Sequence, residues 1–235
     1  MPLLLGLLDR DPYWSRPWPS AVALATQLLL RPALVAGRRV VEVGAGLGVA
    51  GLSASLAGAA SVTLTDREEL SLLCAALTAQ SWGLPLDRPP APQHAALFAD
   101  VADRLYHNTS MVSTSDAAPV GMASLDWHAL QPEQVGAYDV VLCCDVLYEP
   151  GSVAPVAEAV ATLLATEGRL LLADPPHRAA KNRERFMALL KERGGFLFEE
   201  IVTTRVDVAG KESEVLFLNV RRGVDIGGTV GVSTH

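Results

Sequence analysis

The residues most able to do chemistry follow one short apolar run. Glu42 and the glycine-rich turn Gly44-Ala45-Gly46-Leu47-Gly48 come directly after the run at 38–43. Glycines let the backbone turn sharply and approach a ligand closely, and a helix that starts behind them offers free N–H groups. Asp66 ends the next apolar run, where a carboxylate can accept both hydroxyls of a ribose. Together these residues predict a site for a nucleoside-containing cofactor.

Two kinds of cofactor fit such a turn. Gly46, Gly48 and Gly51 match the G-x-G-x-x-G pattern of dinucleotide-binding proteins, a weak signal when it stands alone. Glu42 argues against a dinucleotide, because its carboxylate would lie near a pyrophosphate of the same charge. The ammonium and sulfonium groups of S-adenosylmethionine suit an acid there better. The sequence also lacks a second half with residues for hydride transfer. We therefore favour S-adenosylmethionine, with an NAD-type site and a purely structural turn as the alternatives.

Short apolar runs alternate with helical patterns, which favours the α/β class. We predict a Rossmann-like, seven-stranded, mostly parallel sheet with helices on both faces, helices between the first five strands, and an antiparallel strand pair at the C-terminus. The strands are expected at 38–43, 61–65, 120–125, 138–144, 169–173, 196–202 and 214–220. The helices are expected at 21–30, 49–59, 153–165 and 179–193, with a further amphipathic helix where apolar residues between 70 and 77 recur every three or four positions.

One stretch breaks this alternation. Residues 85–119 are rich in Pro, Ala, Ser and Asp, and a structureless loop of that length is uncommon inside a compact domain. We interpret the stretch as an insertion or long surface loop within a single domain over residues 1–222. Residues 223–235 are expected to be a flexible C-terminal tail.

Composition limits the partners. Half of the residues are hydrophobic and the formal net charge is −7. No basic stripe is present, so we expect no nucleic-acid partner. Cys74, Cys143 and Cys144 lie in apolar stretches, as reduced thiols do, and no metal-ligand spacing occurs. No apolar run is long enough to span a membrane, and the Leu-rich start lacks a basic region. We expect a soluble, cytoplasmic monomer without a metal; the alternative is that the protein is also present in the nucleus.

A set of short motifs resembles one family. The segments are Trp18-Pro19-Ser20-Ala21, VVEVGAGLG, LTDR, LDW and DVLY. In this order they resemble the seven-stranded protein-lysine methyltransferases (methyltransferase family 16), which include calmodulin-lysine and chaperone-lysine methyltransferases. The glycine motif alone marks only the superfamily, whereas the combination with the upstream WP, the DW and the D-x-x-Y is narrower. The resemblance runs from Trp18 to Val220, apart from 85–119.

The resemblance implies roles for the matching residues. The cofactor-binding residues would be Trp18, Glu42, Gly44, Ala45, Gly46, Gly48, Asp66, Asp126, Trp127 and Cys144. Within this set Trp18 would cover the cofactor, Glu42 would support the glycine loop from below, and Trp127 would flank the adenine. Asp145 and Tyr148 would form the D-x-x-Y motif at the substrate entrance, with Asp145 positioning the acceptor amine. The alternatives are that Trp18 and Trp127 are core aromatics and that Tyr148 packs on the rim.

The expected activity is methylation of a lysine side chain in a protein substrate by an S-adenosylmethionine-dependent N-methyltransferase. One alternative is a methyltransferase for another protein residue or a small amine. Another is a non-catalytic nucleotide-binding module. A thiol nucleophile at Cys143 or Cys144 is disfavoured, since no activating base has a recognisable spacing.

Overall fold

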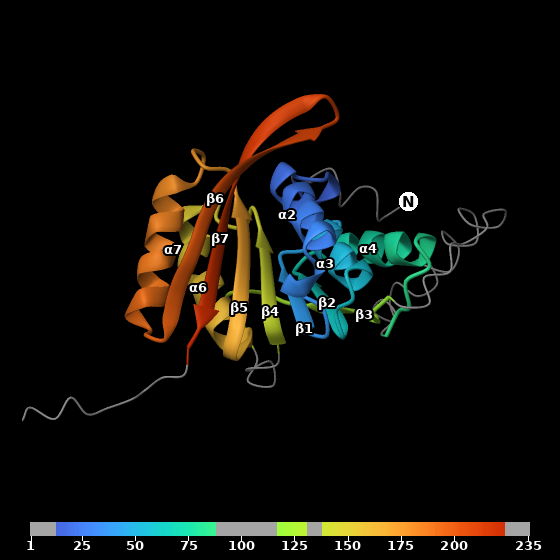
Figure 1. Ribbon diagram of the computed structural model, residues 1–235, viewed down its shortest axis with the longest axis horizontal. Helices are drawn as coiled ribbons and strands as arrows, with labels where there is room; N and C mark the ends of the chain where they lie inside the picture. Colours follow the sequence, from blue (N-terminus) through green and yellow to red (C-terminus); the bar gives the residue numbers. More distant parts are fainter. Residues whose placement is uncertain (1–12, 88–116, 131–137, 224–235) are drawn as a thin grey trace, which may run out of the picture.

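The computed structural model describes residues 13–87, 117–130 and 138–223. Its centre is a seven-stranded sheet in the order β3-β2-β1-β4-β5-β7-β6 (Figure 1). The strands β1 to β5 pair in parallel, and β7 runs antiparallel to both β5 and β6. The strands are β1 (Arg39–Val43), β2 (Ser61–Asp66), β3 (Val120–Ser124), β4 (Tyr138–Cys144), β5 (Leu164–Asp174), β6 (Phe196–Val208) and β7 (Lys211–Arg222). The predicted fold class is confirmed.

Helices cover both faces of the sheet (Figure 1). The α-helices are α2 (Pro19–Leu30), α3 (Val49–Leu56), α4 (Glu69–Ser81), α6 (Val153–Leu163) and α7 (Ala180–Glu192), with the 3-10 turns η1 (Tyr13–Ser15), η2 (Pro32–Leu34) and η5 (Pro150–Ser152). One buried cluster joins α2, α3 and α4 to one face, and a second joins α6 and α7 to the other. Alternate residues of each central strand enter alternate clusters, because successive side chains of a strand point to opposite faces. In β1, for example, Val40 belongs to the first cluster and Val41 to the second.

Helix α3 lies unusually close to the sheet because its inner face carries small residues. A Cβ placed on Gly51 would lie 2.2 Å from Leu64 Cδ2 of β2. Glycine at this position lets the helix pack against β2. The first turn of α3, with its free N–H groups, therefore lies directly after the glycine-rich turn.

The middle of the sheet joins segments that are far apart in the chain. Strand β1 pairs with β4, and an ion pair closes the end at which both strands begin. Asp139 Oδ1 accepts from Arg39 Nη2 at 2.8 Å, and Asp139 Oδ2 accepts from the Arg39 backbone N–H at 2.9 Å. These two residues are 100 positions apart in the sequence.

The C-terminal strands are longer than predicted. The last pairing of β7 with β5 is Leu216 with Asp174, and the residues of β7 before Leu216 pair only with β6. The resulting hairpin projects past the sheet at the top of Figure 1. Ala209 and Gly210 form its turn with φ of +54° and +78°, as in the tight turns that suit twisted hairpins. Strand β5 also starts earlier than predicted, because Leu164 pairs with Tyr138 and ends helix α6 there.

Some predictions lie outside the described residues. Most of the 85–119 insertion and nearly all of the 223–235 tail do so, and the single domain over 1–222 stays a prediction. The residues described between β3 and β4, 125–130, form no helix. No helix of the described part is long and apolar enough to cross a membrane. Within the same ranges no group of His, Cys, Asp and Glu could hold a metal ion.

Candidate functional site

The glycine-rich turn after β1 is a left-handed loop. Gly44, Gly46 and Gly48 have φ of +68°, +52° and +72°, a conformation that side chains with a Cβ rarely adopt. The loop is held by backbone hydrogen bonds, with Ala45 N–H donating to the Thr65 carbonyl at 2.9 Å. The predicted turn is therefore built by the backbone of β1 and β2 together, at the carboxyl ends of the parallel strands. Ligands bind at this end in open α/β sheets.

Asp66 lies beside this loop at the end of β2. Its Oδ2 accepts from the Gly46 N–H at 2.9 Å and its Oδ1 accepts from the Glu68 N–H at 2.9 Å. Burial raises the pKa of Asp66, and these two N–H donors oppose that rise. A carboxylate oxygen has two lone-pair sites, so both oxygens keep capacity for a further donor such as a hydroxyl.

The end of β3 reaches the same place. The Leu125 N–H donates to the Asp66 carbonyl at 3.0 Å, which brings Asp126 and Trp127 next to the loop. A Cβ on Gly44 would lie 2.8 Å from Trp127 Cζ2, so the indole occupies the space that a side chain at position 44 would need. Trp127 is half-buried and also packs on the second core cluster. Its ring is thus both part of the core and part of the wall beside the loop. Asp126 is exposed and accepts from the His128 N–H at 2.9 Å.

Glu42 lies beneath the loop and is fully buried. Its Oε2 accepts from the Gly51 N–H in α3 at 2.8 Å, while Oε1 has no hydrogen-bond partner among the described residues. Burial raises the pKa of Glu42 to about 8. Much of this carboxyl is therefore protonated at neutral pH without a ligand. The expectation that Glu42 presents a full negative charge to the cofactor is therefore not supported, because the carboxyl is fully buried. Its observed role is to anchor α3 under the loop.

The N-terminal segment lies against the loop through the backbone of Trp14, and it carries an aromatic cluster. The Trp14 carbonyl oxygen lies 3.4 Å from the position of a Cβ on Gly46. Trp18, which precedes α2, donates its indole N–H to the Tyr13 carbonyl at 2.8 Å. The Tyr13 ring lies 6.1 Å from the Trp18 ring and 6.3 Å from the Tyr148 ring, centroid to centroid. Sequence analysis missed Tyr13 and Trp14, although an aromatic pair shortly before Trp18 was a visible signal.

The predicted D-x-x-Y motif follows β4. Asp145 is buried with φ of +56°, a conformation uncommon outside glycine and concentrated at functional sites. Tyr148 is 44% exposed, and partial burial raises the pKa of its hydroxyl above the usual value of 10.0, so the phenol is neutral. Cys144, the last residue of β4, is buried, and burial raises the pKa of its thiol well above its usual value. A protonated thiol is a poor nucleophile, in agreement with the prediction that Cys144 is not one.

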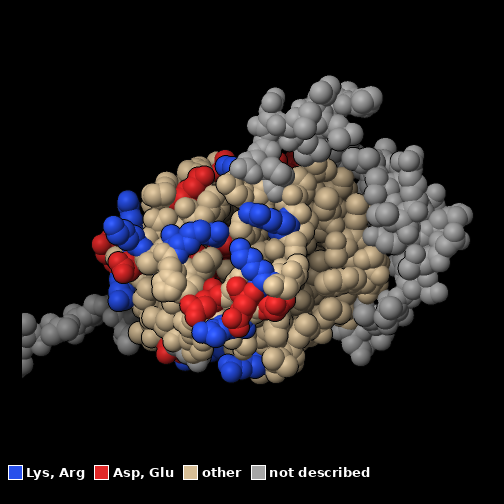
Figure 2. Space-filling model, turned by 90° about the horizontal axis from the view of Figure 1, so that it is seen from above, with Lys and Arg blue, Asp and Glu red and all other residues tan. Residues whose placement is uncertain are grey.

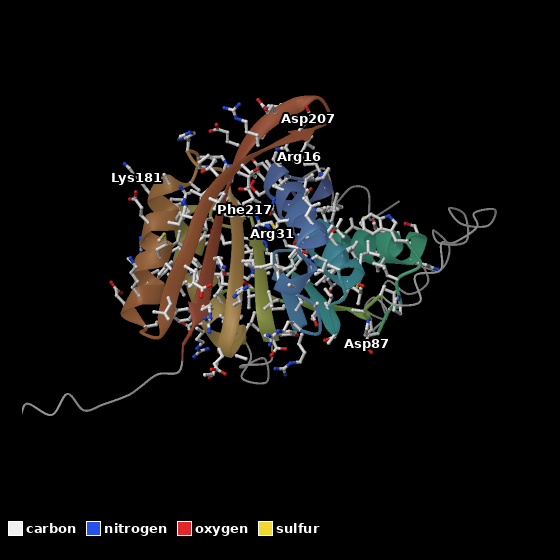
Figure 3. All side chains as sticks on the ribbon, viewed as in Figure 1. Arg16, Arg31, Asp87, Lys181, Asp207 and Phe217 are labelled. Atoms are coloured by element: carbon white, nitrogen blue, oxygen red, sulfur yellow. The ribbon has the colours of Figure 1, made fainter. Side chains whose placement is uncertain are left out.

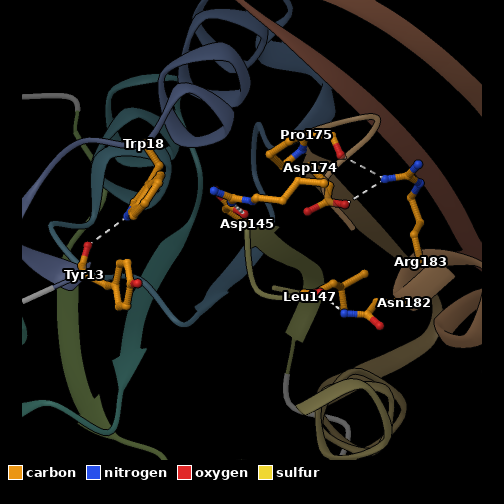
Figure 4. Close-up of polar contacts among 9 residues, drawn as sticks. Tyr13, Trp18, Asp145, Leu147, Asp174, Pro175, Asn182 and Arg183 are labelled. Atoms are coloured by element: carbon orange, nitrogen blue, oxygen red, sulfur yellow. Dashed lines mark hydrogen bonds and ion pairs between the residues drawn. The ribbon is translucent and has the colours of Figure 1, made fainter. Parts of the chain in front are cut away.

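Two arginines and a second acid complete this part of the site (Figure 4). Arg178 forms an ion pair with Asp145 and also lies 5.2 Å from the centre of the Trp18 ring. Asp174 ends β5 and pairs with the buried Arg183 at 2.8 Å. None of these three residues was predicted, although Asp174 follows β5 just as Asp145 follows β4. His177 is 90% exposed and its Nε2 lies 3.7 Å from Glu214 Oε2 of the hairpin.

Two features lie apart from the loop. A hollow of about 240 Å³ separates α2 from the C-terminal strands, and Arg31 and Phe217 mark its walls in Figure 3. Seen from above, acidic and basic side chains gather together over one part of the described surface, and the rest of that face is largely uncharged (Figure 2).

Residues 15–79 match the sequence profile of a family described as lysine methyltransferase. The chain is 40% identical over 63 residues to the electron transfer flavoprotein beta subunit lysine methyltransferase of Danio rerio, covering 27% of this chain and 24% of that protein. It is 38% identical over 72 residues to the protein N-terminal and lysine N-methyltransferase EFM7 of Cryptococcus neoformans, covering 30% and 24%. Each match thus spans about a quarter of the relative's length.

The fold also matches a solved structure. Magnesium protoporphyrin IX methyltransferase from Synechocystis, solved with bound S-adenosylmethionine, superposes with a TM-score of 0.51 at 20% identity, covering 86% of this chain and 78% of that one. At that identity the likeness concerns the fold alone. The family match covers Trp18, the glycine loop and Asp66. Over residues 15–79 the chain therefore carries the sequence pattern of the lysine methyltransferase family. The predicted resemblance is confirmed over these residues.

Proposed function

We propose that this chain is an S-adenosylmethionine-dependent N-methyltransferase whose acceptor is a lysine side chain of a protein. One observation carries the proposal. Inside the segment that matches the lysine methyltransferase family, Asp66 is hydrogen-bonded to Gly46 of the glycine loop at 2.9 Å. The acid suited to a ribose and the loop suited to close backbone approach therefore form one unit at the carboxyl ends of the strands.

The residues present fit such a cofactor. Asp66 keeps a lone pair on each oxygen for a ribose hydroxyl, and the half-buried Trp127 ring stands beside it to flank a base. Gly44, Ala45 and Gly46 would hold the methionine part, under the cover of Trp18. When bound, the cofactor supplies an electrophilic methyl group to a neutral amine.

The remaining chemistry belongs to the acceptor amine. With a reference pKa of about 10.4, about one lysine in a thousand is neutral near pH 7.4, a cost of about 4 kcal/mol. Burial in an apolar entrance lowers the pKa of an amine. Tyr13, Trp18 and Tyr148 supply aromatic faces that attract an ammonium group and exclude water. Asp145 can accept an N–H hydrogen bond and orient the nitrogen.

The first experiment is calorimetric titration with S-adenosylmethionine, S-adenosylhomocysteine, NAD and NADP. We expect micromolar binding of the first two and none of the dinucleotides. Binding of NAD alone, or of no compound, would reject the methyltransferase proposal.

The second experiment addresses the acceptor. The relative from Danio rerio is named for the electron transfer flavoprotein beta subunit, so the purified beta subunit is the first substrate to incubate with radiolabelled S-adenosylmethionine. We expect labelled lysine in the wild-type reaction and at least a hundredfold lower rate with Asp145→Asn, at unchanged cofactor affinity. The name of the Cryptococcus relative also includes the protein N-terminus. Label found at an N-terminus or on a small amine would favour the alternative acceptor.

A further inference from the structure

Asp174 is a buried acid that the proposed roles leave unused. It ends β5, the strand next to β4, and the Asp145 N–H donates to the Ala173 carbonyl at 2.9 Å. The two carboxylates therefore stand on adjacent strand ends. Asp174 is 1% exposed and Asp145 is 7% exposed. Burial, followed by the nearby charge of Asp145, raises the pKa of Asp174 to about 6, which leaves it mainly ionised at pH 7.4.

Each of the two acids has one oxygen without a partner. Asp145 Oδ2 and Asp174 Oδ1 are buried and accept no hydrogen bond from any described residue. An unsatisfied buried acceptor is costly, so each of these oxygens calls for a donor from water or from a ligand. Figure 4 shows the Asp174 carboxylate between Asp145 and Arg183, with one oxygen on the Arg183 side and the other turned away from it.

The two arginines differ in how firmly they are held. Arg183 is 10% exposed and donates to Asp174 Oδ2 at 2.8 Å and to the carbonyls of Pro175 and Pro176 at 3.2 and 2.7 Å. It is a fixed part of the framework. Arg178 is 46% exposed and reaches Asp145 from the surface. Because its guanidinium is half-exposed, Arg178 can move into solvent when another cation takes its place on the buried Asp145 carboxylate.

We propose that Asp145 and Asp174 together form the acceptor site for a primary ammonium group, and that Arg178 occupies its cation position until the substrate lysine displaces it. The inference rests on the proposed function and makes Asp174 a specificity-determining residue. A primary ammonium has three N–H donors, the same number as the two unpartnered oxygens and the Asp145 oxygen that Arg178 vacates. The bound ammonium must release one proton to water before its nitrogen can accept a methyl group. Trp18, over which Arg178 lies, keeps an aromatic face for either cation.

The test uses n-butylammonium chloride as the probe, without cofactor or methyl transfer. The side-chain Nε–Hε signal of Arg178 is followed by ¹⁵N NMR during the titration. Tetramethylammonium chloride at equal ionic strength is the control, because it carries the same charge without N–H donors. We expect n-butylammonium, and not tetramethylammonium, to move the Arg178 signal toward that of a solvent-exposed guanidinium. An unmoved signal, or an equal response to both cations, would overturn the inference.

Variants locate the binding site. Asp174→Asn should weaken n-butylammonium binding at least tenfold, and Arg178→Gln should strengthen it about fivefold, the factor expected for removing a half-exposed competing pair. Arg16→Gln is the matched control, since Arg16 also lies over the Trp18 ring, at 4.0 Å. Equal effects of Arg178→Gln and Arg16→Gln on n-butylammonium binding would show that only the net charge matters, and they would overturn the inference. If circular dichroism shows that Asp174→Asn does not fold, the comparison of Arg178→Gln with Arg16→Gln tests the inference instead.

The two proposals fail separately. If S-adenosylmethionine binds and the beta subunit is methylated while n-butylammonium leaves Arg178 unmoved, only the two-carboxylate site is wrong. If n-butylammonium displaces Arg178 but no S-adenosylmethionine binds, the ammonium site stands and the methyltransferase proposal falls.

Discussion

Replacing Glu42 with glutamine should change how the stability of the protein depends on pH. Glu42 is fully buried, keeps one oxygen without a partner among the described residues, and has its pKa raised from 4.5 to about 8. A carboxyl with a higher pKa in the folded chain binds its proton more tightly there than in the unfolded chain. Its contribution to stability is therefore complete below pH 4.5 and is lost as the pH rises to about 8.

The size of this loss follows from the two pKa values. The full difference corresponds to about 5 kcal/mol of unfolding free energy, of which about 3.5 kcal/mol is lost between pH 5 and pH 8. Glutamine does not titrate, and its amide oxygen can still accept from the Gly51 N–H. The variant should therefore gain about 3.5 kcal/mol relative to the wild type over that pH range. Other carboxyls whose pKa is raised, such as Asp66 and Asp174, are present in both proteins. Their contributions to the pH dependence therefore cancel in the comparison.

The assay is urea unfolding followed by circular dichroism at pH 5, 6, 7 and 8, at constant ionic strength and without cofactor. Glu184→Gln, at an exposed position of α7, is the matched control and should leave the pH dependence unchanged. Parallel stability profiles for Glu42→Gln and the wild type would refute the reasoning, because Glu42 would then be ionised throughout.

Three further predictions concern the site and its framework. In urea unfolding, Gly48→Ala should lower the free energy of unfolding by about 1–3 kcal/mol more than Gly58→Ala. Both glycines have positive φ, but of the two only Gly48 would bring a Cβ against another side chain, Leu64, at 2.7 Å. Equal losses of stability would contradict the packing argument. Asp66→Ala should weaken S-adenosylmethionine binding about 10- to 100-fold by calorimetry, and unchanged affinity would reject its ribose role. Arg183→Met should lower the free energy of unfolding by about 3–5 kcal/mol at pH 7.4, because it leaves the Asp174 charge unpaired. The loss should be smaller below pH 6, where that carboxyl is protonated. A loss of stability that does not change with pH would argue against a charged Asp174.

The parts of the fold that the sequence predicted well are those with a strong local signal. Strand β4 was predicted with its observed bounds because YDVVLCC ends in five consecutive apolar residues directly before Asp145. The long hairpin was predicted too short, because residues 204–208 of β6 and 211–215 of β7 pair only with each other and, apart from Val215, bury little. Polar, two-sided strand segments carry almost no apolar periodicity, and only their register in the structure reveals them.

Within the site, the predicted residues follow chain-local motifs, whereas the missed ones depend on strand order. Asp66 and the glycine loop could be paired from their spacing along two successive strands. The contact of Arg178 with Asp145 joins residues 33 positions apart, and it exists because β4 and β5 are neighbours in the sheet. The protonation of Glu42 was missed for a related reason, since full burial results from packing by α3 and cannot be read from a glutamate in an apolar strand.

The pairing of β1 with β4 also affects how the chain can acquire its structure. The segment that matches the family's sequence profile, residues 15–79, ends before β4, yet β1 has one open edge until Tyr138–Cys144 joins it. An N-terminal fragment limited to that segment would therefore expose the backbone N–H and C=O groups of a buried apolar strand, a template for aggregation. The contact of Arg39 with Asp139 joins residues 100 positions apart. Such non-local contacts form late in folding, and this one can form only after residue 139 has been synthesised. The segment that is most recognisable by sequence is thus not an autonomous folding unit.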